Sequence, residues 1–563
     1  MNLNIYSKLK SYNFFKTSDF ISIIIILLLS ILSILMEGFT IASIPLFFSN
    51  IFQDVKINNP FLTILLDFLN KNNFRNLVDI FLVILFFFFF KSIFLYCLTI
   101  LEFIFLKRLR LRISNILLDK FINNQLTTNY KESSSTKIWK IELINNFTFT
   151  IANYISFFRS FFYLIVVLFA IIYFSIKDFA YFFLLLLTFL LIFYKIFKNK
   201  LYLIGKNIIL FTERKFNIVQ TIFEGFKTIV IFQKQEYFKK IFSKSNVDLE
   251  KNNQLNTIIS SFPNHFFDFF TVLIIFLIYF FILQYNPIEN LIYTLGLISY
   301  GLFRIVSILK TLNQNYLAIK KNSYSVSVLL NELSVNQFPK KNKITKFLNN
   351  NNNNIIEIHN LKFNYNSKKY LFNDLSFKFK RNNFYGLFGD SGSGKSTFLD
   401  IISGINSFNS GSISVYCKRD KISYVSQECF ISQDTIKKNI AFGLDESDIN
   451  SVRIKESIKK SQLSSFVNNL PKKSNFELYK NGTNISVGQK QRLGIARSLY
   501  LYPDLLIMDE PTSALDQETE INFINLLKKL TKNLTIIMTT HKLKLKNKFD
   551  ESLLIKNGKI IKF

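Results

Sequence analysis

The sequence predicts a membrane domain of six transmembrane α-helices followed by a cytosolic α/β domain. Long apolar runs fill the first half, whereas the second half changes to short alternating and helical patterns around a glycine-rich motif. Of the 563 residues, 49% are hydrophobic and only 19% are charged, and 67 are phenylalanine. A chain of this length is too long for one hydrophobic core, and so much apolar surface favours a membrane part over several soluble domains.

Six apolar windows lie before residue 325, and each approaches or exceeds the roughly 20 residues that a helix needs to cross a bilayer. The predicted spans run from Phe20 to Phe48, Leu77 to Leu106, Ile151 to Ile176, Phe179 to Phe197, Ile258 to Leu283 and Leu291 to Leu312. The second and fourth spans continue into polar segments that keep helical apolar spacing, RISNILLDKFI and FNIVQTIFEGF. Residues 1–325 are therefore predicted to form a transmembrane domain with cytosolic helical extensions.

Lysines and arginines are unevenly distributed around these spans. They cluster after the second and the fourth span, whereas the connections after the third and fifth, IKD and QYNPIEN, carry almost none. The positive-inside rule then places both chain ends in the cytoplasm. We expect an integral, multi-pass protein of a bacterial inner (plasma) membrane.

The formal net charge of +31 raises the alternative of a nucleic-acid partner. The lysines are spread along the whole chain instead of being gathered into one patch, which disfavours nucleic acid. The three cysteines, Cys97, Cys417 and Cys429, have no ligand spacing. Neither a disulfide framework nor a zinc site is therefore expected.

The chain changes character after the sixth span. A run of asparagines from Asn349 to Asn354 cannot build a core, and it is predicted to belong to a linker that covers residues 326–354. The segments IIEIHNLKFNY and LSFKFKRNNFYGLFG then alternate like strands, and helical and strand patterns intermix to the end of the sequence. Residues 355–563 are predicted to form one α/β domain of ordinary size.

The stretch GDSGSGKST is a full match to the phosphate-loop pattern G-x-x-x-x-G-K-[ST]. It lies between the apolar strand FYGLF and the helix-like STFLDIISGI, the context that this motif requires. Lys395 is expected to neutralise the terminal phosphates of ATP, the Ser396 hydroxyl to bind Mg²⁺, and backbone N–H groups to close around phosphate oxygens. The predicted ATP-binding residues of the loop are Gly389, Asp390, Ser391, Gly392, Ser393, Gly394, Lys395, Ser396 and Thr397.

Two adjacent acids end a later apolar run, LLIMDE. Because side chains alternate along a strand, Asp509 and Glu510 are expected to point in different directions. We assign Asp509 to Mg²⁺, and Glu510 to orienting or deprotonating the water that attacks the γ-phosphate.

The segment NISVGQKQRLGIARSLYLYPDLLIMDEPTSALD, which runs through these acids, resembles the ATP-binding cassette (ABC) family. In that family the signature segment, here Ile485 to Gln489, caps the γ-phosphate of ATP held by the opposite subunit. The resemblance implies that Ser486, Gly488 and Gln489 contact this ATP, and helix-start N–H groups suit the task. Val487 stands where the family usually has a second glycine, so we expect slower hydrolysis rather than none.

Further positions match the family one at a time. Tyr365 in FNY matches the aromatic residue that stacks on adenine, and Gln427 in YVSQ matches the glutamine that links Mg²⁺ to the membrane part. Asp516 in SALD matches a loop that communicates across the dimer, and His541 in MTTH matches the γ-phosphate switch histidine. The resemblance thus assigns Gln427, Glu510 and His541 to catalysis. The element YKNGTN replaces an acidic GER-like segment of many exporters, so its contact to the membrane helices is expected to differ.

One chain carries one phosphate loop and one signature, so a complete ATP site requires two chains. A homodimer is the simplest assembly, and a heterodimer with a second half-transporter stays open. Six spans followed by a cassette is the order found in ABC exporters, and this resemblance covers the whole chain. It implies ATP hydrolysis coupled to transport.

Ionisable residues inside the predicted spans need a partner, a cavity or a substrate, because each costs at least about 2.5 to 3.5 kcal/mol on insertion scales. Lys91 lies near mid-depth in the second span, and Glu37 lies at a similar depth in the first. One interpretation is an interhelical Lys91–Glu37 ion pair. The other is that Lys91, Arg159 and Arg304 line a cavity for an anionic head group. Both hold if Glu37 binds the lysine until a substrate arrives.

The segments MEGFTIASIPLFFS, EGFKTIVIFQKQEYF and NIAFG resemble the branch of ABC exporters that flips lipid-linked oligosaccharides. This resemblance implies an ATP-driven flippase for a polyprenyl-diphosphate glycan or a similar anionic membrane lipid. The alternatives are an exporter of hydrophobic drugs, lipids or peptides, a basic nucleic-acid ATPase, and a membrane sensor that uses ATP without moving cargo.

Overall fold

The computed structural model describes residues 16–51, 77–123, 133–174, 179–285, 291–334, 346–347, 353–365, 370–513 and 515–563. These residues divide into two compact units, which are described separately. The first unit consists of helices, from α2 to α10, and the second contains the strands β1 to β10 together with shorter helices.

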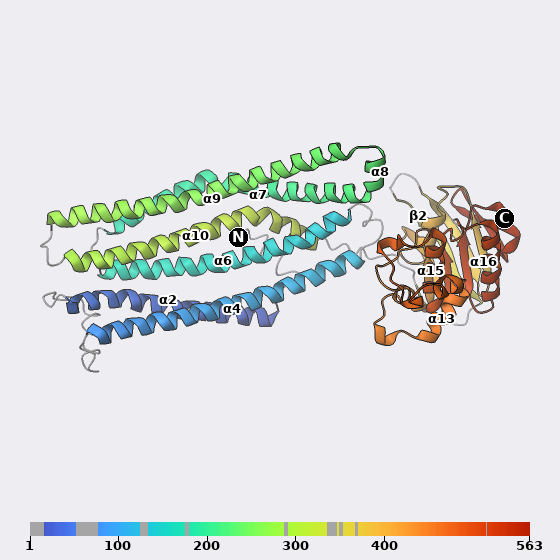
Figure 1. Ribbon diagram of the computed structural model, residues 1–563, viewed down its shortest axis with the longest axis horizontal. Coiled ribbons are helices and arrows are strands. Elements are labelled where there is room, and N and C mark those ends of the chain that lie inside the picture. Colours follow the sequence, from blue (N-terminus) through green and yellow to red (C-terminus); the bar gives the residue numbers. More distant parts are fainter. Residues whose placement is uncertain are drawn as a thin grey trace. The chain divides into compact units, whose positions relative to one another are not determined.

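Long helices that lie side by side build the first unit (Figure 1). They are α2 (Thr17–Ile51), α4 (Leu77–Asn123), α6 (Ser134–Phe174), α7 (Phe179–Glu224), α9 (Gln235–Tyr285) and α10 (Leu291–Ser334), with the short α8 (Phe226–Ile231) between α7 and α9. The 47 residues of α4 correspond to about 70 Å, more than twice the hydrocarbon thickness of a bilayer. The lengths of α4 and α7 agree with the extensions expected beyond the membrane.

Four described helices are long and apolar enough to cross a membrane, judged by length and composition. The segments are Thr17–Gly38, Leu85–Ile122, Ser134–Phe169 and Gln235–Phe276. They lie in the helices that contain the first, second, third and fifth predicted spans. The fourth and sixth predicted spans lie in α7 and α10, where many of the side chains are outside the described residues, as are the connection IKD and most of QYNPIEN.

Helix packing in the first unit follows the apolar spacing of the sequence. α6 packs most extensively against α10, where Leu143 and Phe147 of α6 lie in one buried cluster with Leu329 and Leu330 of α10. α7 and α10 approach so closely at Gly205 that a Cβ atom there would overlap the carbonyl group of Lys321. The packing therefore requires glycine at that position.

Two sheets form the second unit. The first has the order β1-β5-β2-β3, and the second has the order β10-β9-β4-β8-β7-β6. In the second sheet β4, β9, β8, β7 and β6 pair in parallel, and β10 pairs antiparallel with β9. The strands are β1 (Lys346–Phe347), β2 (Asn354–Phe363), β3 (Phe372–Lys380), β4 (Phe384–Phe388), β5 (Ser410–Val415), β6 (Ile422–Val425), β7 (Leu505–Met508), β8 (Thr535–Thr539), β9 (Glu551–Lys556) and β10 (Lys559–Lys562).

Helices connect the parallel strands and bury one face each. They are α11 (Lys395–Ile402), α12 (Ile436–Ile440), α13 (Ser451–Lys460), α14 (Ser464–Asn468), α15 (Val487–Tyr500) and α16 (Gln517–Leu530). β4, β7 and β8 are buried along their whole length. Such continuous burial is typical of central parallel strands, whose carboxyl ends meet at one edge of the sheet. The predicted α/β architecture is present in this unit.

The predicted linker is too long at both ends. α10 continues to Ser334, because Val326, Leu329, Leu330 and Leu333 are buried at helical spacing. Lys346 and Phe347 form β1, which pairs in parallel with β5. A composition argument misses such contacts because it sees neither the packing stripe nor the partner strand. Asn349 to Asn352 lie outside the described residues, and Asn354 begins β2.

Candidate functional site

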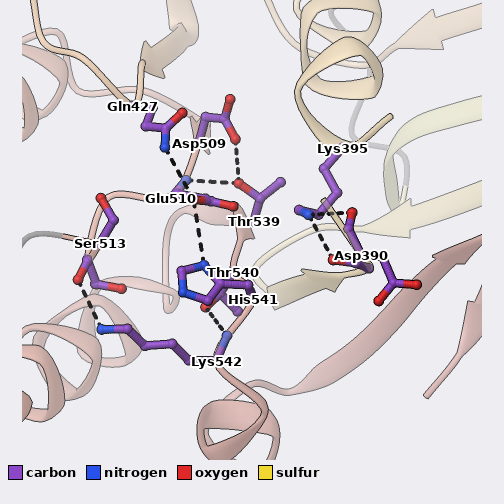
Figure 2. A network of polar contacts seen from close by, with 12 residues as sticks. Asp390, Lys395, Gln427, Asp509, Glu510, Ser513, Thr539, Thr540, His541 and Lys542 are labelled. Atoms are coloured by element: carbon purple, nitrogen blue, oxygen red, sulfur yellow. Dashed lines mark hydrogen bonds and ion pairs between the residues drawn. The ribbon is translucent and has the colours of Figure 1, made fainter. Parts of the chain in front are cut away.

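The phosphate loop follows the central strand β4 and precedes α11, as the motif predicts. Gly392 and Gly394 have φ angles of +80° and +97°, values that residues with a Cβ atom rarely adopt. The buried ammonium of Lys395 donates hydrogen bonds to the carbonyl oxygens of Gly389 at 2.8 Å and Asp390 at 3.1 Å (Figure 2). The loop is therefore closed around its own lysine.

The same loop fits a phosphate group. The hydroxyl oxygen of Ser393 is buried and has no hydrogen-bond partner among the residues that the structure describes. A buried hydroxyl without a partner is costly, so a ligand oxygen at this place would stabilise it. Ser396, at the start of α11, is exposed, so its hydroxyl is accessible to a Mg²⁺ ion. ATP would lie on this loop, and its Mg²⁺ would be held by Ser396, Gln427 and Asp509.

Both predicted acids lie just beyond β7, which ends at Met508. Asp509 is buried, and its Oδ1 accepts a hydrogen bond of 2.6 Å from the Thr539 hydroxyl. Glu510 has a φ angle of +44°, and its Oε2 lies 3.4 Å from Nε2 of Gln427 and 3.6 Å from Nδ1 of His541. The two carboxylates point to different partners, as predicted. The cause differs from the predicted strand alternation, because the backbone of Glu510 is left-handed.

Gln427, Asp509, Glu510 and His541 therefore meet at the carboxyl edge of the central sheet (Figure 2). Lys395 belongs to the loop that follows the neighbouring strand β4. His541 keeps more than half of its side chain exposed, so it remains accessible to a ligand. Parallel strands place these residues, far apart in sequence, at one site.

Thr539 is a site residue that motif reasoning missed. Its hydroxyl donates to Asp509 and also accepts a hydrogen bond of 2.9 Å from the backbone N–H of Glu510. One side chain at the end of β8 thus orients both acids of the neighbouring strand. The signal was available in MTTH, because a polar residue at the end of an otherwise apolar buried strand requires a partner.

The signature segment begins α15. The Ser486 hydroxyl accepts from the backbone N–H of Gln489 at 3.2 Å, and the Gln489 side chain accepts from the Ser486 N–H at 2.9 Å. This capping box exposes the helix start, and Val487 is 59% exposed there. Among the described residues, no hydrogen bond or ion pair joins residues 486–489 to the phosphate loop. The geometry agrees with a signature that serves another chain.

Asp516 and Tyr365 lie at the periphery. Asp516 is exposed and caps α16 by accepting from the N–H of Thr519 at 3.0 Å, and this hydrogen bond lowers its pKa. The Tyr365 ring is exposed and packs edge-on against Phe363 at 5.0 Å, with its hydroxyl 2.8 Å from that of Thr397. Tyr365 is therefore attached to the end of the phosphate loop, with a ring face available for stacking.

Asp400 is a second residue that the motifs did not reveal. It lies on α11, where its Oδ1 accepts a 3.3 Å hydrogen bond from the Tyr424 hydroxyl. Burial, together with the nearby charge of Asp509, raises the pKa of Asp400 to about 6. A carboxyl near the site therefore changes its charge at about pH 6, well above the usual range of a carboxyl.

The predicted intramembrane ion pair is present in the helical unit. Glu37 of α2 is fully buried and pairs with Lys91 of α4. The same carboxylate pairs with Arg304 of α10, whose Nη2 donates to Oε2 at 2.9 Å. We call these three residues the Glu37 cluster. It holds two cations around one carboxylate, an arrangement that the pairwise sequence interpretation did not contain.

Arg159 of α6 pairs with an acid that the sequence interpretation did not include. Its Nη1 lies 2.5 Å from Oε1 of Glu102 on α4. Sequence reasoning had not used Glu102, although an acid inside a predicted span is itself a signal. Arg159 thus has a counter-charge of its own, whereas Lys91 and Arg304 share Glu37.

An apolar helical unit and an α/β unit with a phosphate loop, paired acids and a signature helix together define an ATP-binding membrane protein class. The ABC transporter family profile matches residues 372–513. The phosphate import ATP-binding protein PstB of Mycoplasma pneumoniae is 34% identical over 226 residues, which cover 37% of this chain and 68% of that protein. The chain belongs to the ABC transporter family.

Two further relatives have export-related names. A putative export ATP-binding/permease protein of Rickettsia typhi is 36% identical over 37% of this chain and 38% of its own length. An ATP-dependent lipid A-core flippase of Saccharophagus degradans is 32% identical over 37% of this chain and 36% of its own length. The aligned part of this chain thus spans only about a third of each of these two proteins.

The fold extends further than the sequence similarity. A solved structure of a bacterial Atm1-family ABC exporter with ATP bound has a TM-score of 0.75, covers 96% of this chain and is itself covered to 94%, at 16% identity. The chain therefore has the ABC exporter fold, with apolar helices first and the ATPase domain second.

Proposed function

We propose that the protein is an ATP-driven membrane exporter or flippase. The observation that carries this proposal is the cluster of Gln427, Asp509, Glu510 and His541 beside the phosphate loop, in a chain with the exporter fold. Glu510 would orient or deprotonate the attacking water, Lys395 would bind the phosphates, and Mg²⁺ would neutralise the developing charge. His541, whose Nδ1 lies 3.6 Å from Oε2 of Glu510, would contact the γ-phosphate beside that carboxylate.

The names of the sequence relatives do not decide between export and import, since they include both kinds of protein. The fold favours export. PstB is named for phosphate import, and the Rickettsia protein is named for export. The similarity to an exporter structure extends over nearly the whole chain. The protein would work as a homodimer, with each ATP held between the phosphate loop of one chain and the signature of its partner. It would lie in a bacterial inner membrane with both termini in the cytoplasm.

The cargo we propose is an anionic lipid, with a lipid-linked oligosaccharide on a polyprenyl diphosphate as the leading candidate. Support comes from the Glu37 cluster, where two cations share one buried carboxylate and the Arg304 side chain remains 30% exposed. Arginine binds phosphate through its planar fork of donors, and a diphosphate carries enough charge to compete with a single carboxylate. One relative is named a lipid A-core flippase, which agrees with a lipid cargo.

Arg159 would bind the anionic head group less strongly than Lys91 and Arg304, because Glu102 neutralises its charge. Glu37 would hold Lys91 and Arg304 until the diphosphate arrives. The ligand drives transport only through a difference in affinity between the two states of the protein.

The test is the ATPase rate of the purified protein in lipid, titrated with polyprenyl-diphosphate sugars and, separately, with hydrophobic drugs and peptides. Glu510→Gln should abolish hydrolysis and thereby identify the activity as belonging to this protein. Stimulation by the diphosphate lipids alone supports the flippase. Stimulation by the other compounds alone would support the alternative exporter and leave the charges with a structural role.

A double variant examines the head-group site directly. Lys91→Gln with Arg304→Gln should remove stimulation by the diphosphate lipid while leaving basal ATPase intact. Lys310→Gln is the matched control, since Lys310 lies on the same helix as Arg304 and pairs with Asp268 instead. Unchanged stimulation in the double variant would exclude charge capture by this cluster.

A further inference from the structure

Lys542 directly follows the switch histidine and joins three segments of the ATPase domain. Its ammonium Nζ lies 2.7 Å from Oε1 of Glu520 and donates to the carbonyl oxygen of Thr512 at 3.3 Å. Its backbone N–H donates to the Thr540 hydroxyl at 3.1 Å (Figure 2). The Lys542 side chain therefore connects the segment that carries His541 to the turn at Thr512 and to helix α16 (Gln517–Leu530) at Glu520.

Thr512 and Glu520 lie close in sequence to Glu510 and Asp516. Thr512 follows Glu510 by two residues, and Glu520 lies in the first turn of α16. The N–H of Glu520 donates to the carbonyl oxygen of Asp516 at 2.8 Å, and Asp516 caps the same helix. The Lys542–Glu520 pair thus links the residue after His541 to the loop that contains Asp516.

The acid of this pair is shielded from water, and the lysine is partly shielded. The side chain of Glu520 is 6% exposed and that of Lys542 is 29% exposed, and Thr512 is buried. Screening by solvent is weak at such a site, so loss of one partner leaves a buried charge without compensation. By contrast, exposed ion pairs of the same protein contribute little.

His541 needs an anchor of this kind. Its Nδ1 lies 3.6 Å from Oε2 of Glu510, which is longer than a hydrogen bond, and most of its ring is exposed. The position of the ring is therefore determined mainly by the backbone on either side. Thr539 anchors that backbone on one side through both acids, and Lys542 anchors it on the other.

We propose that Lys542 is a positioning residue for ATP hydrolysis, which holds His541 and the Asp516 loop in a fixed relation through Glu520. This inference rests on the proposed ATPase activity. Within the described part of the chain, no hydrogen bond or ion pair joins Lys542 to the phosphate loop, Asp509 or Glu510, so it acts on the rate of hydrolysis through His541. ATP binding by the phosphate loop does not depend on it.

The experiment compares Lys542→Met and Glu520→Gln with the wild-type protein, full-length and in lipid. We expect kcat to fall about tenfold in each variant while the KM for ATP stays within about twofold, because misplacing a group that acts only in the transition state lowers kcat alone. Lys542→Arg should keep most of the activity. The exchange of both residues, Lys542→Glu with Glu520→Lys, should recover activity relative to Lys542→Glu alone.

Lys528→Met is the matched control, since Lys528 is on the same helix as Glu520 and pairs with Asp550 at 3.4 Å near the surface. Binding of a fluorescent ATP analogue with wild-type affinity shows that a variant is folded. Unchanged kcat in Lys542→Met, an equal loss in Lys528→Met, or a rise in KM without a fall in kcat would overturn the inference. A wild-type protein without Glu510-dependent ATPase would overturn the proposed function and this inference with it.

Discussion

At the carboxyl edge of the central sheet, single residues orient the charged side chains of the proposed ATP site. Thr539 orients Asp509 and Glu510 together, so two acids on adjacent positions do not compete for one orientation. Lys395 is held by carbonyl oxygens of its own loop. Asp400 is the exception, because burial favours its neutral form.

Asp400→Asn should stabilise the ATPase domain at neutral pH. A carboxyl whose pKa is raised from about 3.9 to about 6 on folding binds more protons in the native state, so stability falls as the pH rises through that window. The full cost is approached above about pH 6 and amounts to about 3 kcal/mol, at about 1.36 kcal/mol per pKa unit. The variant removes this cost and keeps the acceptor for Tyr424.

Thermal unfolding of the purified protein without Mg²⁺ measures the effect. We expect the midpoint of Asp400→Asn to lie a few degrees above that of the wild type at pH 8, with about half of the difference left at pH 5. Ser403→Ala, at the end of the same helix, serves as a control that leaves the pH dependence unchanged. A difference between Asp400→Asn and wild type that grows toward acid pH would contradict the explanation.

At the scale of elements, two of the helices depend on particular residues, one at the start of a helix and one at a close contact between two helices. α15 begins with a capping box that presents Val487, and α7 requires Gly205 where it meets α10. The excursion between α7 and α9 contains α8, which begins directly after Gly225. Each feature depends on one or two side chains at the end or the contact face of a helix.

Val487→Gly should raise the rate of ATP hydrolysis several-fold. The β-branched side chain is exposed at the helix start that would face the γ-phosphate of the partner's ATP, so its removal lets the backbone N–H groups approach more closely. Glycine costs about 0.5 to 1 kcal/mol of helix stability, which is small here. The steady-state ATPase rate in lipid is the measurement.

Val452→Gly is a suitable control for that variant, because Val452 is also exposed in the first turn of a helix, α13, but belongs to no motif. It should leave the rate unchanged. If Val487→Gly hydrolyses ATP no faster than the wild type, the valine does not limit the cap, and slow hydrolysis would need another cause.

At the scale of the whole molecule, we propose that the ATP site is completed by a second copy of the chain. Within the described residues the signature helix makes no hydrogen bond or ion pair to the phosphate loop, although both lie in the same domain. Two copies related by a two-fold axis would supply two complete sites. The fold of the exporter neighbour is consistent with such an arrangement.

Complementation tests the shared site. Lys395→Ala and Ser486→Arg should each abolish ATPase when expressed alone, since each dimer then lacks either both loops or both signatures. Co-expression should restore roughly a quarter of the wild-type rate, because about half of the dimers are mixed and each mixed dimer holds one intact site of two. No recovery, with mixed dimers isolated by two affinity tags, would mean that the site does not form between copies of this chain.

The sequence by itself determined the architecture and the chemistry of the ATP site. Apolar runs of membrane length, the phosphate loop, the acids after LLIM and the signature are local patterns whose spacing is dictated by helix rise, strand alternation and phosphate geometry. The ion pair between Lys91 and Glu37 was also within reach, because charges at equal depth in neighbouring spans have few other partners.

Only the tertiary structure decided which side chains share a partner. Arg304 joins Lys91 on Glu37, Arg159 takes Glu102, Thr539 orients both acids, and Lys542 reaches Glu520. The residues in each of these contacts lie on different helices or strands. Their distance along the chain carries no information about the contact, which depends on how the elements pack. That is the physical reason why motifs identified the site and packing alone identified the residues that hold it in place.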